Sequence, residues 1–290
     1  MRARETSNNP TGGLVTISIR SHSLQRKRTR VISQLKELGS VLVALSGGVD
    51  SSVVAALAFE ALGQNAVAVT FDSPLIVPEE IKDAREVAKT IGIRHQIQPI
   101  NELEVSSITP NPYDRCYHCK IHRFREAKVL AVKLGLNAVV DGTSASDLGE
   151  HRPGLQAIKE LTIISPLLDA GITKSEARQL ARELKLPVAN RPSNSCLATR
   201  IPYGEELTEE RLARVAAAEK AIRTIIDVGI LRVRDHGRLA RIEVASTDLP
   251  KLLQPHISEE IFEQLKTLGY EFVTVDLKGY RFGSFDVKSS

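Results

Sequence analysis

A short run of glycine, serine and aspartate directly follows an apolar segment near the start of the chain. Residues 41–45 predict a buried strand and residues 53–62 an apolar helix, with Ser-Gly-Gly-Val-Asp-Ser-Ser at 46–52 between them. The two glycines permit a tight turn, so the backbone N–H groups of the turn can converge on one anion at the helix N-terminus. Asp50 and the serines after it can cap the helix or reach the anion or its magnesium ion. This pattern favours binding of a phosphate group.

Three cysteines are the second set of residues suited to chemistry. Cys116 and Cys119 are three positions apart at the start of a helix expected over 120–134, and Cys196 lies far along the chain. This spacing lets the first two sulfurs face one metal ion, and the helix N-terminus and nearby basic side chains favour thiolates. These basic residues are Arg115, Lys120 and Arg200.

Three thiols are one ligand short of a closed metal site, so several interpretations stay open. A histidine completes a zinc centre, or three thiolates hold an iron–sulfur cluster with one iron left open. The candidate histidines are His118, His122 and His151. Three unrelated buried thiols are the remaining alternative.

Other expected strands also end in polar residues. Strands are predicted over 66–71, 95–100 and 138–140, with a helix over 79–92 between the first two. Strands that alternate with helices in this way imply right-handed β-α-β crossovers, and hence an α/β fold with a Rossmann-like parallel sheet. Because ligands lie at the carboxyl ends of such strands, Thr70 can border a nucleotide and Gly142 would permit close approach of a ligand.

The remaining segments suggest a tail and two domains. Residues 1–20 are expected to be a disordered tail in which only residues 14–19 could form a strand, and a basic helix over 24–38 leads into the first strand. We expect residues 21–204 to form the nucleotide-binding domain and 205–290 a small α+β domain. In the second domain the pattern predicts helices over 208–227 and 258–268 and half-buried strands over 230–233, 239–244 and 272–277.

Composition restricts the class of protein. The 290 residues are 42% hydrophobic and 26% charged, with a net charge of +4, 4% aromatic residues and no tryptophan. Such mild charge and few aromatic side chains make a nucleic-acid partner unexpected. No apolar run is long enough to span a membrane and no signal peptide is evident, so we expect a cytoplasmic protein with reduced thiols.

The heptad at 46–52 lacks the Gly-Lys-Ser/Thr of a Walker A loop and resembles the PP-loop of the ATP pyrophosphatase superfamily. Those enzymes cleave ATP between its α and β phosphates and use AMP to activate a carboxylate or carbonyl. The resemblance implies that ATP and Mg²⁺ bind at the loop and the adjacent strand ends. The residues expected to bind them are Ala44, Ser46, Gly47, Gly48, Val49, Asp50, Ser51, Ser52, Thr70 and Gly142.

Four segments together resemble the LarE family of ATP-dependent sulfur transferases. They are the PP-loop, Arg-Cys-x-x-Cys-Lys at 115–120, Asp-Gly-Thr-Ser at 141–144 and Cys-Leu-Ala-Thr-Arg-Ile-Pro-Tyr-Gly at 196–204. The match covers nearly all of the chain after residue 20. It implies a homo-oligomer that converts the carboxylates of pyridinium-3,5-biscarboxylic acid mononucleotide to thiocarboxylates, for the nickel-pincer cofactor of lactate racemase.

LarE-like proteins come in two kinds. The single-cysteine kind gives up its own cysteine sulfur, leaving dehydroalanine, whereas the three-cysteine kind is understood to hold a [4Fe-4S] cluster whose open iron carries a transferable sulfide. Cys116, Cys119 and Cys196 fit the second kind, with Cys196 at the position of the sulfur-bearing cysteine. The resemblance also implies catalytic roles for Asp50, Glu219, Arg232 and Arg234, the two arginines binding a phosphate or carboxylate of the substrate.

Two alternative functions remain. A PP-loop tRNA thiolase also pairs ATP activation with cysteines or a cluster, but the mild charge and the lack of an added RNA-binding segment disfavour it. A non-catalytic ATP-binding or iron–sulfur sensor protein would show no turnover of ATP dependent on a carboxylate substrate.

Overall fold

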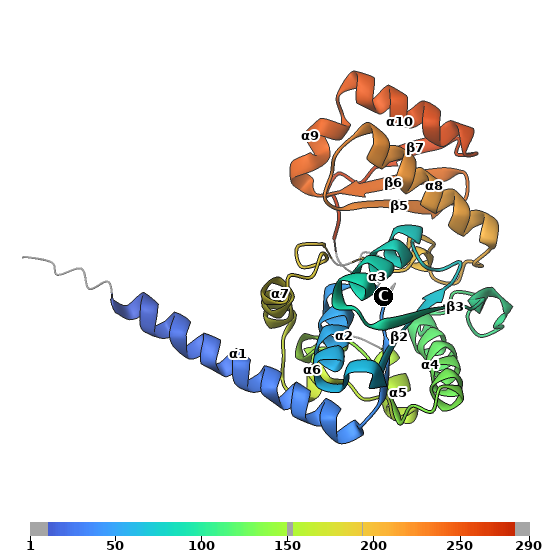
Figure 1. Ribbon diagram of the computed structural model, residues 1–290. Coiled ribbons are helices and arrows are strands. Elements are labelled where there is room, and N and C mark those ends of the chain that lie inside the picture. The colour runs from blue at the N-terminus through green and yellow to red at the C-terminus, as the bar shows by residue number, and fades with distance from the viewer. Residues whose placement is uncertain (1–10, 150–152, 193, 282–290) are drawn as a thin grey trace, which may run out of the picture.

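The computed structural model describes residues 11–149, 153–192 and 194–281. These residues contain a four-stranded parallel sheet of order β3-β2-β1-β4 and a three-stranded sheet of order β5-β6-β7 (Figure 1). The strands are β1 (Val41–Ala44), β2 (Ala66–Asp72), β3 (Arg94–Pro99), β4 (Ala138–Val140), β5 (Leu231–His236), β6 (Leu239–Val244) and β7 (Phe272–Val275). The α-helices are α1 (Thr11–Leu38), α2 (Val49–Leu62), α3 (Pro78–Ile91), α4 (Arg115–Lys133), α5 (Gly154–Glu160), α6 (Pro166–Asp169), α7 (Lys174–Glu183), α8 (Glu209–Ile225), α9 (Leu249–Leu252) and α10 (Pro255–Thr267).

Helices cover both faces of the parallel sheet. Val41 and Val43 of β1 contribute to one apolar core together with α1, α2, α3 and α7. Leu42, between them, belongs to another core with Phe124 of α4 and Ile158 of α5. Because successive side chains of a strand point to opposite faces, this alternation produces a three-layered sandwich. The predicted α/β fold with a Rossmann-like parallel sheet is confirmed.

The second sheet has its own apolar core. Strand β5 is antiparallel to β6, which is parallel to β7, and α8, α9 and α10 supply apolar residues to this core. A separate apolar cluster joins Leu75, just after β2, to Leu197 and to Leu212 of α8. Leu197 begins the short 3-10 helix η4 (Leu197–Arg200). The division of the chain at residues 204 and 205 stays a prediction.

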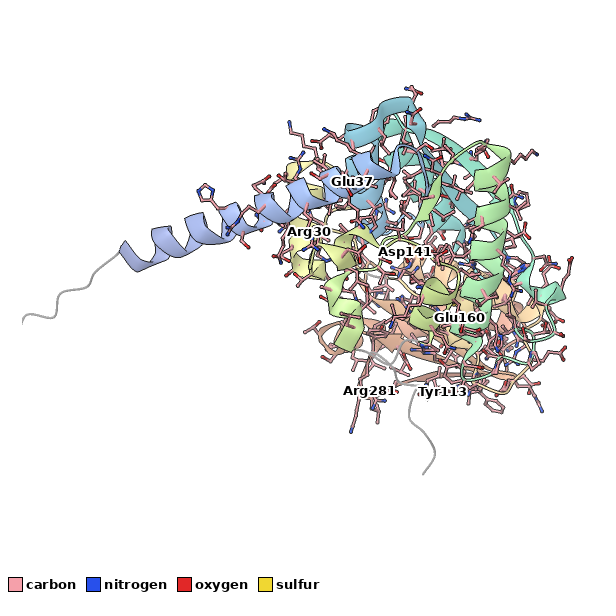
Figure 2. All side chains as sticks on the ribbon, turned by 90° about the horizontal axis from the view of Figure 1, so that it is seen from below. Arg30, Glu37, Tyr113, Asp141, Glu160 and Arg281 are labelled. Atoms are coloured by element: carbon pink, nitrogen blue, oxygen red, sulfur yellow. The ribbon has the colours of Figure 1, made fainter. Side chains whose placement is uncertain are left out.

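The first helix is longer than expected. The prediction of a strand over 14–19 is wrong, because α1 runs without interruption from Thr11 and satisfies its backbone N–H and C=O groups internally. Residues 11–20 of the expected disordered tail are therefore helical, and residues 1–10 lie outside the described part of the chain. The N-terminal part of α1 projects away from the rest of the molecule (Figures 1 and 2).

The basic side chains of α1 are partly engaged in ion pairs. Lys27 Nζ lies 2.8 Å from a carboxylate oxygen of Glu176, and Arg28 Nη2 lies 2.5 Å from Glu60. In the part of the chain that the structure describes, no helix combines the length and apolarity needed to cross a membrane.

Strand β5 is buried throughout its first five residues, although the sequence predicted a half-buried strand there. Arg232 and Arg234 are 4% and 5% exposed, and Asp235 is fully buried. For Arg234 the difference has a clear cause, because Glu243 of the neighbouring strand β6 accepts hydrogen bonds from its Nε and Nη2 at 3.0 and 2.7 Å.

The carboxylate of Asp235 connects α8 to the second sheet. It accepts hydrogen bonds from Nη2 of Arg211 at 2.8 Å, Nη2 of Arg214 at 2.6 Å and the hydroxyl of Tyr270 at 3.0 Å. Burial opposes ionisation, but the bonds from Arg211, the backbone of Gly237 and Arg214 together hold the pKa of Asp235 below its ordinary value.

We expect Asp235→Asn to lower the free energy of unfolding at pH 7 by about 2–4 kcal/mol, because the half-buried Arg214 loses its carboxylate partner and Arg211 keeps Glu205 alone among the described carboxylates. Because the folded-state pKa is depressed, the wild-type contribution is present above about pH 4 and is lost as the pH falls through the folded pKa. Urea unfolding of wild type and variant at pH 7 and at pH 3 measures both effects.

Glu271→Gln is the matched control for this prediction, because Glu271 pairs with Arg238 of the same sheet at an exposed position. This substitution should lower the free energy of unfolding by less than about 1 kcal/mol. Equal effects of the two substitutions would contradict the assignment of Asp235 as the charge that joins α8 to the sheet.

Candidate active site

The predicted phosphate-binding turn connects β1 to α2. Gly47 has φ of +79°, and a Cβ atom there would lie 2.6 Å from the carbonyl oxygen of Glu80 at the start of α3. Glycine is therefore required both by the backbone conformation and by the close approach of α3. Gly48 is the N-cap of α2 and provides no side-chain cap. The Ser52 N–H donates to the Gly48 carbonyl at 3.1 Å and the Gly48 N–H to Ser46 Oγ at 3.3 Å. N–H groups at the start of a helix have no acceptor within the helix, which makes this end of α2 a candidate site for an anion.

The serine hydroxyls of this loop hold the turn together. Ser51 Oγ accepts a hydrogen bond from the Ser46 N–H at 3.1 Å and lies 3.0 Å from Ser46 Oγ. Ser52 is fully buried and its hydroxyl donates to the Gly48 carbonyl at 2.7 Å. Phosphate binding would therefore rely on backbone N–H groups, with the serines shaping the loop.

Thr70 and Gly142 support the loop from the neighbouring strands. The Thr70 hydroxyl donates to the carbonyl of Leu45 at 2.6 Å, and a Cβ atom at Gly142 would lie 2.6 Å from the backbone nitrogen of Ser51. The close approach predicted for Gly142 is thus to the loop backbone. Asp141, just before it, lies inside the molecule and accepts a hydrogen bond from Ser165 at 2.6 Å (Figure 2).

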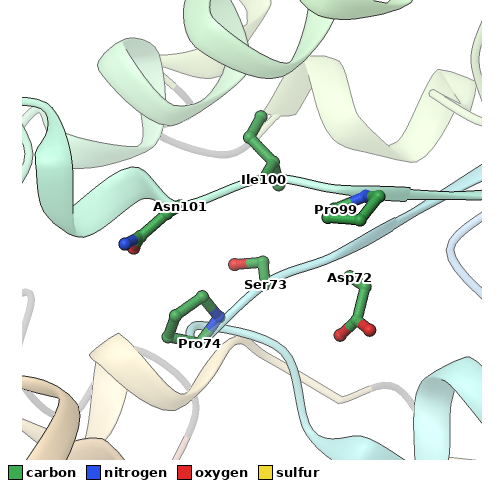
Figure 3. A pocket seen from close by; sticks show the side chains of 6 residues that line it. All are labelled: Asp72, Ser73, Pro74, Pro99, Ile100 and Asn101. Atoms are coloured by element: carbon green, nitrogen blue, oxygen red, sulfur yellow. The ribbon is translucent and has the colours of Figure 1, made fainter.

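An open pocket of about 550 Å³ lies at the carboxyl ends of β2 and β3 (Figure 3). Its lining residues are Asp72, Ser73, Pro74, Pro99, Ile100 and Asn101. Sequence reasoning missed the ion pair linked to it, in which Arg123 Nε donates to Glu102 Oε1 at 2.6 Å and Glu102 also accepts from the hydroxyl of Ser73. The sequence offered one clue to this arginine: Arg123 lies four residues after Cys119 on α4, and this spacing places both side chains on the same face of the helix.

The three cysteines come together around one arginine. Cys116 and Cys119 lie in the first turn of α4, Cys196 directly precedes η4, and all three thiols are free. Cys119 and Cys196 pack against the same apolar cluster, which includes Leu75. Arg115 interacts electrostatically with all three cysteines. The folded chain therefore gathers residues that are up to 80 positions apart in sequence, as the numbers of Cys116 and Cys196 show (196 − 116 = 80).

Among the described residues, no three His, Cys, Asp or Glu side chains are close enough to hold one metal ion. Of the histidines proposed for a zinc centre, His118 lies with its Nε2 3.3 Å from Asp114, and His151 is outside the described residues.

The thiols are not activated in the way the sequence suggested. Desolvation raises the pKa of Cys119 to about 12, because the opposing effect of Arg123 is smaller. Desolvation and then the neighbouring Cys196 also raise the pKa of Cys116, even though this side chain reaches solvent. The expectation of ready thiolates is wrong for these two residues, since desolvation outweighs the helix N-terminus and the basic side chains. A bound metal would have to displace their protons.

The segment that carries Cys196 is held by a buried ion pair. Arg200, which is fully buried, donates Nε and Nη2 to the two carboxylate oxygens of Glu219 at 2.8 and 3.1 Å. Its Nη1 donates to the carbonyl oxygens of Ser195 at 2.6 Å and Cys196 at 3.1 Å. Glu219 also accepts from the backbone of Val233 at 3.0 Å. Glu219 thus lies in the site, where it connects α8, β5 and the cysteine segment.

The two predicted arginines of β5 adjoin this ion pair. Arg234 Nη1 donates to the carbonyl of Thr199 in η4 at 2.6 Å. Burial and then the like charge of Arg200 lower the pKa of Arg232 to about 10, so it remains cationic at neutral pH. Two cations this close together favour an anion between them.

Glu80 connects the loop to the arginine group. Its backbone carbonyl packs against Gly47, while its side chain interacts with Asn194, Arg200 and Arg232. Burial raises the pKa of Glu80 despite these partners. Glu80 and Arg200 thus connect the loop, the Cys196 segment and Arg232. That these residues form one active site stays a prediction.

Comparison with known proteins identifies the chemistry of such a site. A family model for NAD synthase matches residues 25–147, which include the loop. An uncharacterized protein of Synechocystis sp. is 42% identical over 250 residues, covering 86% of this chain and 93% of that protein. The pyridinium-3,5-bisthiocarboxylic acid mononucleotide synthase of Lactiplantibacillus plantarum is 35% identical over 262 residues, covering 90% and 94%.

A more distant relative is the tRNA-specific 2-thiouridylase MnmA of Azorhizobium caulinodans, 32% identical over 206 residues that cover 57% of this chain and 52% of that protein. This similarity is limited to about half of the thiouridylase. The similarity to the Lactiplantibacillus synthase, by contrast, covers nearly the whole length of both chains. The chain therefore belongs to the LarE family of PP-loop proteins and is an ATP-dependent sulfurtransferase.

Proposed function

We propose that the enzyme activates the carboxylates of pyridinium-3,5-biscarboxylic acid mononucleotide with ATP and converts them to thiocarboxylates, a step of nickel-pincer cofactor synthesis. One observation carries the proposal. Arg200 holds the Cys196 segment by backbone hydrogen bonds and also lies beside Arg232 and Glu80, so the sulfur centre, an anion-binding group and the PP-loop adjoin one another. A relative that is similar in sequence over 94% of its length is named a synthase of the corresponding bisthiocarboxylic acid mononucleotide.

ATP is proposed to bind with its β and γ phosphates on the N–H groups at 47–52. These groups stabilise the pyrophosphate that leaves when a substrate carboxylate oxygen attacks the α phosphorus. Asp50, in the first turn of α2, would hold Mg²⁺ there. The product of this step is an acyl adenylate, which a carboxylate needs because it is otherwise a very poor acyl donor.

Arg232 is proposed to bind the anionic substrate. Because burial and Arg200 lower its pKa to about 10, a phosphate or carboxylate would relieve the repulsion between the two guanidinium groups. Arg234 and Glu219 would hold η4 against β5, since Arg234 of β5 donates to the Thr199 carbonyl and Glu219 accepts from both Arg200 and Val233. In this way they fix the distance between the bound anion and Cys196.

The sulfur centre is proposed to hold a [4Fe-4S] cluster of the three-cysteine kind. Three free thiols that interact with one buried cation support this, as do the apolar side chains against which Cys119 and Cys196 pack. Cys116, Cys119 and Cys196 would hold the cluster. When bound, it would supply the sulfide that displaces AMP and leaves the thiocarboxylate. The free thiols also support a reducing compartment, the cytoplasm, and the family resemblance supports a homo-oligomer.

The first prediction from the proposed function concerns the substrate. With ATP, Mg²⁺, sulfide and the pyridinium mononucleotide, the anaerobically reconstituted enzyme should form AMP and pyrophosphate in equal amounts, together with thiocarboxylate detected by mass spectrometry. Without the mononucleotide, formation of AMP should fall at least about tenfold, because the carboxylate is the attacking group. Thiolation of tRNA added under the same conditions would instead identify a tRNA thiolase. AMP formation that depends on neither the mononucleotide nor tRNA would contradict the proposal.

The second prediction concerns the PP-loop. Gly48→Ala fits the folded chain, because φ is −80° and the new Cβ would lie 3.4 Å from its nearest neighbour, Ser46 Oγ. The free energy of unfolding should therefore change by no more than about 1 kcal/mol. The dissociation constant for ATP should nevertheless rise at least about tenfold, because the methyl group enters the space of the phosphates.

Gly229→Ala is the control for this prediction, because a Cβ atom at Gly229 meets no atom within 4 Å. Calorimetric titration with ATP and thermal unfolding are to be measured for both variants. An unchanged ATP affinity in Gly48→Ala would place the nucleotide elsewhere.

The third prediction concerns the cysteines. Wild type purified without oxygen should show a broad absorption band near about 400 nm and about four irons per chain. Cys116→Ala, Cys119→Ala and Cys196→Ala should each lose the band, because each removes one of three ligands. Thermal unfolding of the iron-free proteins controls for folding, and retention of full iron content in any of the three variants would exclude that cysteine as a ligand.

A further inference from the structure

Arg115 is the arginine around which the three cysteines gather, and it is only 1% exposed. One of its terminal nitrogens, Nη1, donates to the side chain of Asn111 and to the carbonyl of Ala198, the latter at 3.3 Å. The guanidinium carbon lies 5.5 Å from the centre of the Tyr203 ring. These contacts fix the plane of the guanidinium group between α4 and η4.

The other two nitrogens of this guanidinium group, Nε and Nη2, are buried and have no hydrogen-bond partner. Arginine remains cationic in proteins, and a buried charge is normally paired with a carboxylate or another anion. Two other buried arginines of the described residues follow this rule: Arg200 pairs with Glu219 and Arg234 with Glu243. None of the ion pairs among the described residues involves Arg115.

The groups that act on Arg115 are able to become anionic. Burial disfavours its charge, while Cys196, Cys116, Tyr203 and Cys119 favour it and together raise its pKa. Arg115 directly precedes Cys116, and its Nη1 donates to the carbonyl of Ala198, two residues after Cys196. Anionic sulfur at these cysteines is therefore placed to balance the charge of Arg115.

We propose that Nε and Nη2 of Arg115 donate hydrogen bonds to anionic sulfur at the three-cysteine centre, and that Arg115 is a positioning residue that stabilises the loaded centre. The proposal rests on the cluster of the proposed function. Three thiolates outweigh the positive charge of an oxidised cubane core, so the loaded centre is anionic as a whole. Arg115 supplies the missing counter-charge and two donors in a fixed plane, which selects the loaded state over the empty one.

Two variants separate the charge from the hydrogen bonds. Arg115→Gln removes the charge, whereas Arg115→Lys keeps it but loses the fixed pair of donors. Arg125→Gln is the matched control, because Arg125 is an exposed arginine on the same helix. Each full-length protein is reconstituted without oxygen with ferrous iron and sulfide. Iron content, reduction potential, rate of iron loss to a chelator and melting temperatures of the empty and loaded forms are then measured.

Arg115→Gln should shift the reduction potential to a more negative value, because adding an electron near a lost positive charge is less favourable. It should also lose iron at least about tenfold faster than wild type and lower the melting temperature of the loaded form far more than that of the empty form. Arg115→Lys should keep a potential close to wild type but lose iron faster. The Arg125→Gln protein should match wild type in every measurement.

The outcomes separate two failures. A wild-type protein that takes up no iron would overturn the proposed centre and this inference together. A wild type that binds the cluster, with Arg115→Gln unchanged in potential and in iron loss, would overturn the inference alone. Equal lowering of the melting temperature in the empty and loaded forms would reduce Arg115 to a structural residue, and this result would also overturn the inference. If Arg115→Gln does not fold, wild-type iron loss by Arg115→Lys would overturn it as well.

Discussion

The buried ion pair between Arg200 and Glu219 is the interaction on which the rest of the site depends. Arg200 comes from η4, next to Cys196, and Glu219 comes from α8 in the C-terminal half of the chain. Glu219 also accepts the N–H of Val233 in β5. A single carboxylate therefore links the cysteine segment, a helix and a strand of the second sheet. Without it, Arg200 would be an uncompensated charge in an apolar interior, which is strongly destabilising.

This ion pair explains how two separately folded sheets serve one reaction. The parallel sheet contributes the turn after β1 and places α3 so that Glu80 reaches both Gly47 and Arg200. The second sheet contributes Arg232, whose charge faces that of Arg200. In the proposed function, Arg232 would bind a carboxylate or phosphate group of the substrate.

At the cysteines, too, the structure holds a buried cation, Arg115, whose missing partners are proposed to arrive with the bound sulfur. Desolvation raises the pKa of Cys116 and of Cys119, and two buried nitrogens of Arg115 have no hydrogen-bond partner. Under the proposal, anionic sulfur bound by the cysteines would supply these partners.

Much of the parallel sheet could be predicted from the sequence, because apolar runs such as β1 and β2 directly reflect burial on both faces of a sheet. The loop was recognisable because its tight backbone turn requires glycine, so the residue types themselves indicate the turn. The burial of Arg232 and Arg234 could not be predicted, since their partners lie on other elements and a strand pattern says nothing about them. The internal use of the Ser51 and Ser52 hydroxyls was hidden for the same reason. The expected strand over 14–19 failed because a local β-branched pattern does not report whether a partner strand exists.

The central claim is that sulfur is transferred repeatedly from a centre that Cys116, Cys119 and Cys196 hold and that survives the reaction. The most direct test is the intact mass of the chain together with the amount of thiocarboxylate formed per chain, after incubation with ATP, the pyridinium mononucleotide and excess sulfide. The account predicts several thiocarboxylates per chain and an unmodified residue 196. No more than one thiocarboxylate per chain, with dehydroalanine in place of Cys196, would contradict it and identify an enzyme that consumes its own cysteine.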